Sequence, residues 1–267
     1  MNIKPKKSLG QNFLKTKEIL DIVIQTANIK DKDIVLEIGP GKGALTEKLL
    51  EKAKEVIVVE KDNRLIEFLN EKFESDVKTK KLKIIEGDIL DIDICEVLDT
   101  LQYKVVANIP YYITGQIIKK FLSEEKQPSD IVLMVQKEVA ERIVDKPESI
   151  LSLSVKVYGT PKYIKTVKAK HFSPQPKVDS AILLIKNISK NVFIENNIKE
   201  NDFFDLVKAG FSHKRKYLLN NLETNWILMN KNKEKLKDIL EKSDISLKIR
   251  AENLSLEDWI NILKHNF

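Results

Sequence analysis

The sequence predicts an α/β protein with a doubly wound, mainly parallel sheet, followed by a small C-terminal all-helical domain. In the first half of the 267-residue chain, short runs of β-branched and aliphatic residues alternate with segments whose apolar residues have helical spacing. This alternation indicates βαβ units, which build parallel sheets covered by helices on both faces. A hydrophobic fraction of 42% is enough for a packed core, so wholesale disorder is excluded.

The strands and helices of this sheet can be placed one after another along the chain. The expected strands are residues 34–38, 56–59, 82–85, 105–107, 131–135 and 180–185, and the expected helices are residues 44–53, 63–73, 116–122 and 138–144. Four strands end at an unusual residue: Gly39, Glu60, Asp88 and Asn108. Ligands of such sheets bind at the carboxyl ends of the strands, so these four positions are the first candidates for a site.

The C-terminal part of the chain has a different pattern. Residues 186–201 are rich in Asn, Lys and Ile and are expected to form a linker. Beyond them the apolar residues have helical spacing, and Ser255 with Asp258 three residues later is typical of a helix N-terminus. We therefore divide the chain into residues 1–186, which include a basic N-terminal arm, and a helical domain of residues 187–267.

Several classes of protein are excluded by composition. Cys95 is the only cysteine, so neither an intramolecular disulfide nor a cluster of thiolate metal ligands can form. The three histidines lie far apart in the sequence, and we predict no metal site. No apolar run approaches the ~18 residues that a membrane span needs. We expect a soluble cytoplasmic protein, whose net charge of +6 permits a polyanionic partner without naming one.

A glycine-rich turn follows the first expected strand of the sheet. In the stretch Gly39-Pro40-Gly41-Lys42-Gly43, glycines allow the backbone to approach a ligand closely, and the next helix offers free amide hydrogens. The dinucleotide fingerprint G-x-G-x-x-G is not met, because Ala44 stands where its last glycine belongs. Glu60, at the end of the next strand, can accept hydrogen bonds from both hydroxyls of a ribose. That feature is common to nicotinamide and S-adenosylmethionine (SAM) sites.

Asp88 helps to separate these two cofactors. Its carboxylate, at the end of the third strand, can accept a hydrogen bond from an adenine amino group, while Ile89 packs on the ring. Acidic residues at two successive strand ends suit a nucleoside held across the sheet edge better than a pyrophosphate. We therefore favour SAM over a dinucleotide.

The stretch Asn108-Ile109-Pro110-Tyr111 closes the fourth strand. By itself it fits a turn as well as an active site. As an active site, the Asn108 side-chain oxygen and the Ile109 carbonyl would accept the two hydrogens of an adenine amine, directing its lone pair at the methyl sulfonium. Pro110 is rigid and favours an extended Ile109. Tyr111 offers a face on which a splayed-out base can stack.

Six stretches follow one another in a characteristic order. They are Gln11-Asn12-Phe13-Leu14, Leu36-Glu37-Ile38-Gly39-Pro40-Gly41, Glu60, Gly87-Asp88, Asn108-Ile109-Pro110-Tyr111 and Phe172-Ser173-Pro174-Gln175-Pro176-Lys177-Val178-Asp179-Ser180. In this order they resemble the ribosomal RNA adenine N6,N6-dimethyltransferases over essentially the whole chain. The resemblance implies a Rossmann-like SAM-dependent methyltransferase fold. It also implies SAM contacts at Asn12, Leu14, Gly39, Glu60, Asp88 and Asn108, and an adenine held between Tyr111 and Phe172.

Within that family the chain resembles most the bacterial small-subunit (16S) branch. That branch dimethylates two adjacent adenines in the hairpin loop near the 3′ end of the small-subunit RNA. Residues 211–222 resemble its basic helix and residues 250–257 another of its motifs, although His213-Lys214 and Tyr217 depart from the usual residues. The alternatives are the large-subunit (23S) branch, which confers macrolide resistance, and a ribosome-assembly factor that acts mainly by binding.

The basic residues expected to contact RNA lie in two places. Lys6 and Lys7 belong to the N-terminal arm, and Lys214, Arg215 and Lys216 belong to the expected basic helix. Lysine-rich faces are often merely solvated, and this reading stays open. The implied partner is small-subunit rRNA in an immature 30S particle, and we expect a monomer that needs neither a membrane nor a metal. Tyr112 is expected to be structural, because only one phenol can cover the base.

Overall fold

The chain forms two compact units. The computed structural model describes every residue except 1–2, 7–8, 99, 101, 229–232 and 266–267, and describes residues 225–228 and 233 by their backbone alone. One unit contains residues 1–140 and 160–188, and the other contains residues 141–159 and 189–267. The domain division expected at residue 186 thus differs from this division mainly in residues 141–159, which belong to the second unit. Its helix α8 (Ile150–Lys156) contacts a C-terminal helix, α10 (Glu200–Gly210).

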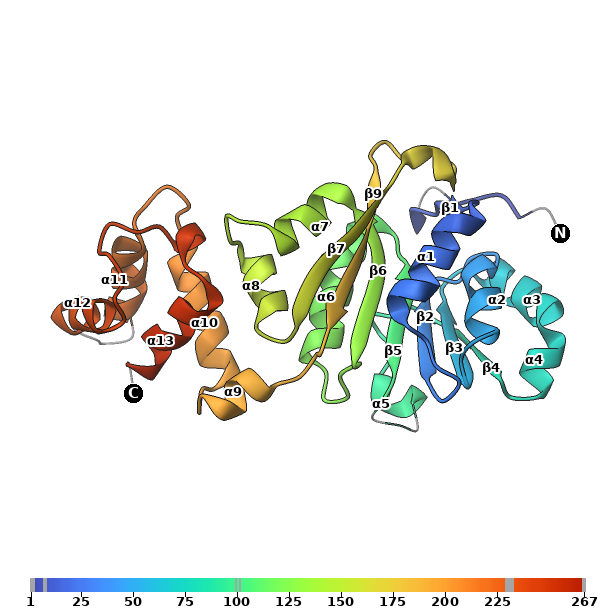
Figure 1. The fold of residues 1–267 in the computed structure, drawn as a ribbon, viewed down its shortest axis with the longest axis horizontal. Coiled ribbons are helices and arrows are strands. Elements are labelled where there is room, and N and C mark those ends of the chain that lie inside the picture. Colours follow the sequence, from blue (N-terminus) through green and yellow to red (C-terminus); the bar gives the residue numbers. More distant parts are fainter. Residues whose placement is uncertain (1–2, 7–8, 99, 101, 229–232, 266–267) are drawn as a thin grey trace. The chain divides into compact units, whose positions relative to one another are not determined.

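The first unit is built on a seven-stranded sheet (Figure 1). The strand order is β4-β3-β2-β5-β6-β9-β7. Strands β2 to β6 pair in parallel, whereas β9 pairs antiparallel with both β6 and β7. The strands are β2 (Ile34–Ile38), β3 (Glu55–Glu60), β4 (Leu82–Glu86), β5 (Lys104–Asn108), β6 (Asp130–Gln136), β7 (Thr160–Val167) and β9 (Ser180–Lys186). The predicted doubly wound, mainly parallel sheet is confirmed.

The chain changes direction across the sheet between β2 and β5. From β2 it moves outward through β3 to β4, and it then returns to build β5 and β6 on the other side of β2. The loops that leave β2 and β5 therefore diverge, which opens a crevice at the carboxyl ends of these strands. Gly39 follows β2 at this point, and Asn108 is the last residue of β5.

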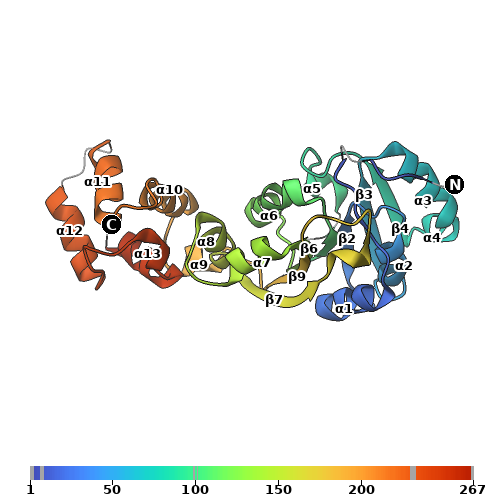
Figure 2. The ribbon, with the colours of Figure 1, turned by 90° about the horizontal axis from the view of Figure 1, so that it is seen from above.

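Helices cover both faces of the sheet. One buried cluster packs α1, α2 and α3 against apolar residues of β2, β3, β5 and β6, and α6 lies on the opposite side from α1 (Figure 2). The helices of this unit and its connections are α1 (Lys17–Ala27), α2 (Ala44–Leu50), α3 (Asn63–Lys72), α4 (Glu74–Lys78), α5 (Ile94–Val97), α6 (Thr114–Ser123) and α7 (Lys137–Val144). Helix α1 was not predicted, although its buried residues Ile19, Leu20, Val23 and Ala27 have helical spacing.

The second unit is helical. It contains α8 and α10 together with α9 (Asn191–Glu195), α11 (Leu218–Leu228), α12 (Lys233–Lys242) and α13 (Leu256–Lys264). The expected linker is therefore interrupted by α9, whose Phe193 packs edge-on against the rings of Tyr158 and Phe203. The predicted helix start at Ser255 is confirmed, because Ser255 and Asp258 form a reciprocal capping box. Among the described residues, no helix combines the length and apolarity needed to cross a membrane.

Candidate active site

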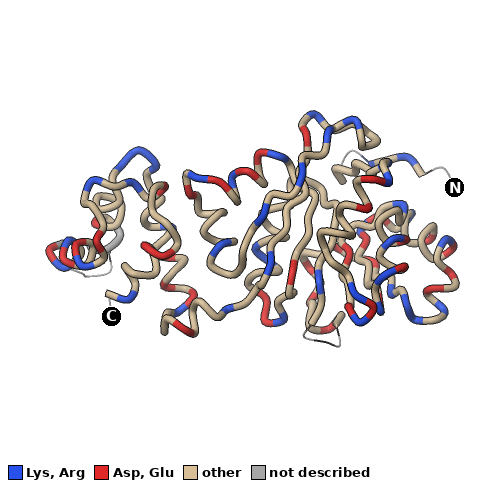
Figure 3. The backbone as a smooth tube through the Cα atoms, viewed as in Figure 1, with Lys and Arg blue, Asp and Glu red and all other residues tan. Residues whose placement is uncertain are grey.

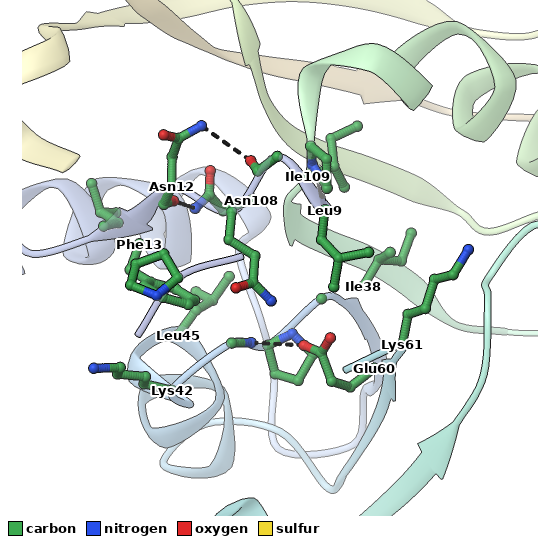
Figure 4. A pocket seen from close by; sticks show the side chains of 18 of the residues that line it. Leu9, Asn12, Phe13, Ile38, Lys42, Leu45, Glu60, Lys61, Asn108 and Ile109 are labelled. Carbon is green, nitrogen blue, oxygen red and sulfur yellow. Dashed lines mark hydrogen bonds between the residues drawn. The ribbon is translucent and has the colours of Figure 1, made fainter. Parts of the chain in front are cut away.

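A cavity of about 580 Å³ lies at the crevice between β2 and β5 (Figure 4). This volume falls within the usual range of small-molecule sites. The ends of β2, β3, β4 and β5 form one side of the cavity, and the other side is formed by the N-terminal arm, by which we mean residues 3–6 and 9–14. The cavity contains all four strand-end positions expected from the sequence: Gly39, Glu60, Asp88 and Asn108.

The glycine-rich turn needs glycine for two reasons. Gly39, Gly41 and Gly43 all have positive φ angles, of 64°, 58° and 74°, which disfavour other residues. A Cβ on Gly41 would also lie 2.7 Å from the Phe13 ring. A Cβ on Gly39, in contrast, would have no described atom within 4 Å apart from those of its own residue and its two chain neighbours. The turn therefore packs tightly under the arm at Gly41 and leaves room in the cavity at Gly39.

Glu60 is held rigidly at the end of β3. The residue is 6% exposed, and its two carboxylate oxygens accept hydrogen bonds from the Gly41 amide at 3.2 Å and the Asp62 amide at 2.9 Å. Burial raises the pKa of Glu60, while these backbone hydrogen bonds oppose the rise. Each oxygen keeps a further lone pair, so the carboxylate can still accept hydrogen bonds from the hydroxyls of a bound ribose.

Asp88 lies on the neighbouring wall of the cavity. It accepts hydrogen bonds from Lys61 Nζ at 2.6 Å and from the Leu90 amide at 3.0 Å. Burial raises the pKa of Asp88, but these hydrogen bonds outweigh burial and place the pKa below its ordinary value. Beside it, Ile89 is buried and lines the cavity. An ionised acceptor next to an apolar side chain suits the amino edge and the ring of an adenine.

Asn108 is oriented by the arm. Its Nδ2 donates a hydrogen bond to the Asn12 carbonyl oxygen at 3.0 Å (Figure 4). A carbonyl can only accept, so the nitrogen of the amide must face Asn12, and Oδ1 is the atom left to accept from a ligand. The Asn12 side chain is fixed in turn, because its Nδ2 donates to the Gly10 carbonyl oxygen at 3.1 Å.

The residues after Asn108 form one rigid wall. Ile109 is buried, Pro110 has φ of −59° and ψ of 132°, and Tyr111 begins a short 3-10 helix that ends at Ile113. The Tyr111 hydroxyl is 2.5 Å from Ser180 Oγ, on the first residue of β9. Burial raises the pKa of Tyr111, while the Ser180 hydrogen bond acts against the rise. The phenol is therefore neutral and held in place at the cavity wall.

A comparison of the chain with known protein families gives a match along almost its whole length. The model of the family described as ribosomal RNA adenine dimethylase matches residues 2–265. The chain belongs to this family.

Individual members agree with this assignment. The ribosomal RNA small subunit methyltransferase A of Fusobacterium nucleatum is 43% identical, over 99% of this chain and 98% of the relative. The protein of the same name from Bacillus pumilus is 40% identical, over 96% and 89%. A dimethyladenosine transferase structure from Plasmodium falciparum has a TM-score of 0.77 at 32% identity, covering 94% and 96% of the two chains. The 23S rRNA methyltransferase ErmE has a TM-score of 0.76 over 95% and 99%, but at 22% identity it shows the fold alone.

The family motif that begins at Phe172 lies differently from expectation. Phe172 is 1% exposed and belongs to the buried cluster under α1, α2 and α3. It forms β8 (Phe172–Ser173), which pairs antiparallel with β1 (Phe13–Leu14), and Leu14 lies opposite Phe172 in the register. Ser173 lines the cavity, whereas Phe172 does not. The ring packs in the core of this structure, and its expected stacking role stays a prediction.

The basic residues expected to bind RNA have separate environments. Lys6 is bound to Asp62, with Nζ 3.2 Å from Oδ1, and Lys7 lies outside the described residues. Lys214, Arg215 and Lys216 are exposed, but they lie in the turn between α10 and α11 and not on a helix, which corrects the expected basic helix (Figure 3). The turn begins after Gly210, where the close approach of the Trp259 ring leaves no room for a Cβ.

The sequence analysis gave no role to three residues that line the cavity, Phe13, Glu37 and Lys61, and it expected Tyr112 to be structural. Phe13 covers Gly41, and Lys61 pairs with Asp88. Glu37 is buried in the cavity wall and accepts a 2.6 Å hydrogen bond from Thr46 Oγ1. Burial raises the pKa of Glu37 to about 8, although the Thr46 hydrogen bond acts to lower it. Tyr112 is 64% exposed at the cavity. A polar residue inside an apolar strand, as Glu37 is in β2, was the one available signal.

Proposed function

We propose that this protein transfers methyl groups from SAM to the N6 amines of two adjacent adenines in the 3′-terminal hairpin loop of small-subunit rRNA. The family supports an rRNA adenine dimethyltransferase, and relatives at 36–43% identity carry the small-subunit name. The large-subunit alternative has only the fold likeness to ErmE in its favour. An immature small-subunit particle as substrate, and action as a monomer, belong to the same proposal.

The cavity fits SAM. Gly39 leaves space where a side chain would stand, and Glu60 and Asp88 place acceptors at successive strand ends for a ribose and an adenine. The arm supplies Asn12 and Leu14, which line the cavity as the family resemblance implies. When bound, SAM supplies an electrophilic methyl group on its sulfonium.

The orientation of Asn108 is the observation that carries the chemistry. An adenine amine is a poor nucleophile, because its lone pair is delocalised into the ring. Asn108 Oδ1 and the Ile109 carbonyl can accept its two hydrogens, which favours a pyramidal nitrogen with a directed lone pair. The methylated ammonium that forms is acidic and releases its proton to solvent, so no general base is required. Tyr111 provides the stacking surface, and catalysis rests on positioning and on preorganised acceptors.

The test is methylation of purified ribosomal subunits. Labelled SAM is incubated with unmethylated small or large subunits, and the modified bases are mapped. We expect two N6,N6-dimethyladenines in the small-subunit RNA, none in the large-subunit RNA, and almost no label with Asn108→Ala. Label on a large-subunit adenine would refute the small-subunit assignment. Binding of small subunits by wild type without any turnover would favour the assembly-factor alternative.

A further inference from the structure

A buried carboxylate beside the cavity binds the N-terminal arm. Asp62 is 1% exposed and occupies the N-cap position of α3. An Asp at this position normally accepts hydrogen bonds from the first amides of its own helix. In the described chain the Asp62 side chain makes no such cap bond. Its two oxygens are therefore available for other donors.

Four side-chain hydrogen bonds converge on this carboxylate. Arg64 donates to both oxygens, from Nε at 2.9 Å and from Nη2 at 2.6 Å. The arm supplies the other two donors, which are Lys6 Nζ at 3.2 Å and Gln11 Nε2 at 3.0 Å. Arg64 also donates to the Lys4 carbonyl oxygen at 3.4 Å, and the Lys6 amide donates to Gln11 Oε1 at 2.8 Å. Three arm residues are thus gathered at one buried charge.

The charge of Asp62 persists at physiological pH. The hydrogen bonds from Arg64 lower the pKa of Asp62 most, and those from Gln11 and Lys6 lower it further, against the opposing effect of burial. Hydrogen bonds to an ionised acceptor are about twice as strong as neutral ones. The arm is therefore attached through charge-assisted bonds and not through ordinary surface contacts.

The arm has a second attachment on the far side of the cavity. There the Asn12 carbonyl accepts from Asn108, and Phe13 and Leu14 pair with β8. Leu9 and Gly10 lie in the sequence between the two Asp62 donors Lys6 and Gln11, and they line the cavity together with Gln11 and Asn12. Asp62 also acts on the cavity floor, because its amide donates to the ribose acceptor Glu60. One residue thus joins the arm to the proposed cofactor site.

We propose that Asp62 is a positioning residue that holds the arm closed over the cofactor and so slows cofactor release. The inference rests on the proposed function, since it assumes that the cavity holds SAM. Lys6 is then part of the attachment of the arm. Loss of the Asp62 charge frees the part of the arm that contains Lys6 and Gln11, while the pairing of Phe13 and Leu14 with β8 stays.

The experiment measures the rate at which S-adenosylhomocysteine leaves the full-length protein. We expect Asp62→Ala to release S-adenosylhomocysteine about tenfold faster or more. The loss of hydrogen bonds to a charged group corresponds to a change of at least that size. A Lys6→Ala/Gln11→Ala variant, which removes only the arm's donors, should show a similar increase. Combining all three substitutions should add little, because both changes break one attachment. Asp62→Asn, which keeps an acceptor, should lie between wild type and Asp62→Ala.

The control is Asp93→Ala, which removes an N-cap carboxylate that does cap its own helix and lies outside the cavity. It should leave the release rate unchanged. A purely structural role for Asp62 predicts instead that Asp62→Ala accelerates release by the same factor in the Lys6→Ala/Gln11→Ala background as in wild type. Such fully additive effects on the release rate would overturn the inference. If Asp62→Ala does not fold, an unchanged release rate in Lys6→Ala/Gln11→Ala overturns it.

The wild type separates the two proposals. If it binds no S-adenosylhomocysteine, the proposed cofactor site itself fails. If it binds the ligand and Asp62→Ala releases it at the same rate, only the role of Asp62 fails. Tryptic cleavage after Lys6 gives an independent readout. The bound ligand should slow this cleavage in wild type, and Asp62→Ala should accelerate it.

Discussion

Glu37 allows the electrostatics of the cavity wall to be tested without any substrate. The pKa of this buried carboxyl is raised from 4.5 to about 8 by burial, and the Thr46 hydrogen bond only partly offsets the effect. Below pH 4.5 the group is protonated in both the folded and the unfolded chain. As the pH rises further, the unfolded chain loses this proton first, so the folded state is progressively destabilised up to about pH 8.

The size of this effect follows from the two pKa values. One pKa unit corresponds to about 1.4 kcal/mol. For a single site with these pKa values, the free energy of unfolding falls by about 3 kcal/mol between about pH 5.5 and pH 8. Glu37→Gln keeps an acceptor for Thr46 but cannot ionise. The stability of the variant relative to wild type should therefore rise by about that amount across the same interval.

Urea unfolding at the two pH values measures this difference. Glu51→Gln is the matched control, because it removes a negative charge from an exposed position near the end of α2. The control should change by much less than Glu37→Gln. If the two variants show the same pH dependence relative to wild type, Glu37 is not a buried neutral carboxyl and the reasoning fails.

Three further predictions concern ligands and RNA. Glu60→Ala should weaken SAM binding about tenfold or more, through lost bonds to a charged acceptor; unchanged affinity by calorimetry would remove Glu60 from the site. Tyr111→Ala should lower kcat/KM on unmethylated small subunits by roughly 5- to 150-fold through lost stacking, while its SAM affinity should stay within a few-fold of wild type. Tyr111→Phe keeps the ring and should lose little activity. Full activity of the alanine variant would contradict the stacking role. Replacing Lys214, Arg215 and Lys216 by alanine should weaken the salt dependence of binding to small-subunit particles. The slope of log affinity against log salt concentration should become shallower by ~0.7–0.9 for each lost phosphate contact. Equal slopes would point to a merely solvated turn.

Most of the sheet could be read from the sequence because its central strands are buried on both faces, whereas the largely exposed edge strand β7 was not predicted. The strand expected at residues 34–38 matches β2 residue for residue, and the other expected strands differ by only one or two residues at their ends. The parallel order then brings Glu60 and Asn108 to one edge without any knowledge of side-chain contacts. The strand-end part of the site was therefore predictable from local pattern and the geometry of parallel sheets.

The rest of the site depends on contacts between residues far apart in the chain. Nothing near Asp62 in the sequence indicates that it binds Lys6 and Gln11, because an Asp before a helix predicts a cap. In the same way, the buried position of Phe172 follows from its pairing with Leu14, more than 150 residues earlier. Such pairings leave no periodic signal, so an aromatic residue of the core and one of a binding surface look alike in sequence.

In the proposed mechanism, the arm links cofactor binding to methyl transfer in a way that Tyr111 does not. The Asn12 carbonyl accepts from Asn108 Nδ2 and so leaves Oδ1 for the proposed substrate, and Asn12 belongs to the same arm that Asp62 attaches. Tyr111 is held instead by Ser180, at the start of β9 and independently of the arm. Loosening the arm should therefore disturb both cofactor retention and the turnover step, whereas changes at Tyr111 should affect turnover alone. A variant that releases the cofactor faster yet methylates bound substrate at the wild-type single-turnover rate would show that the orientation of Asn108 does not depend on the closed arm.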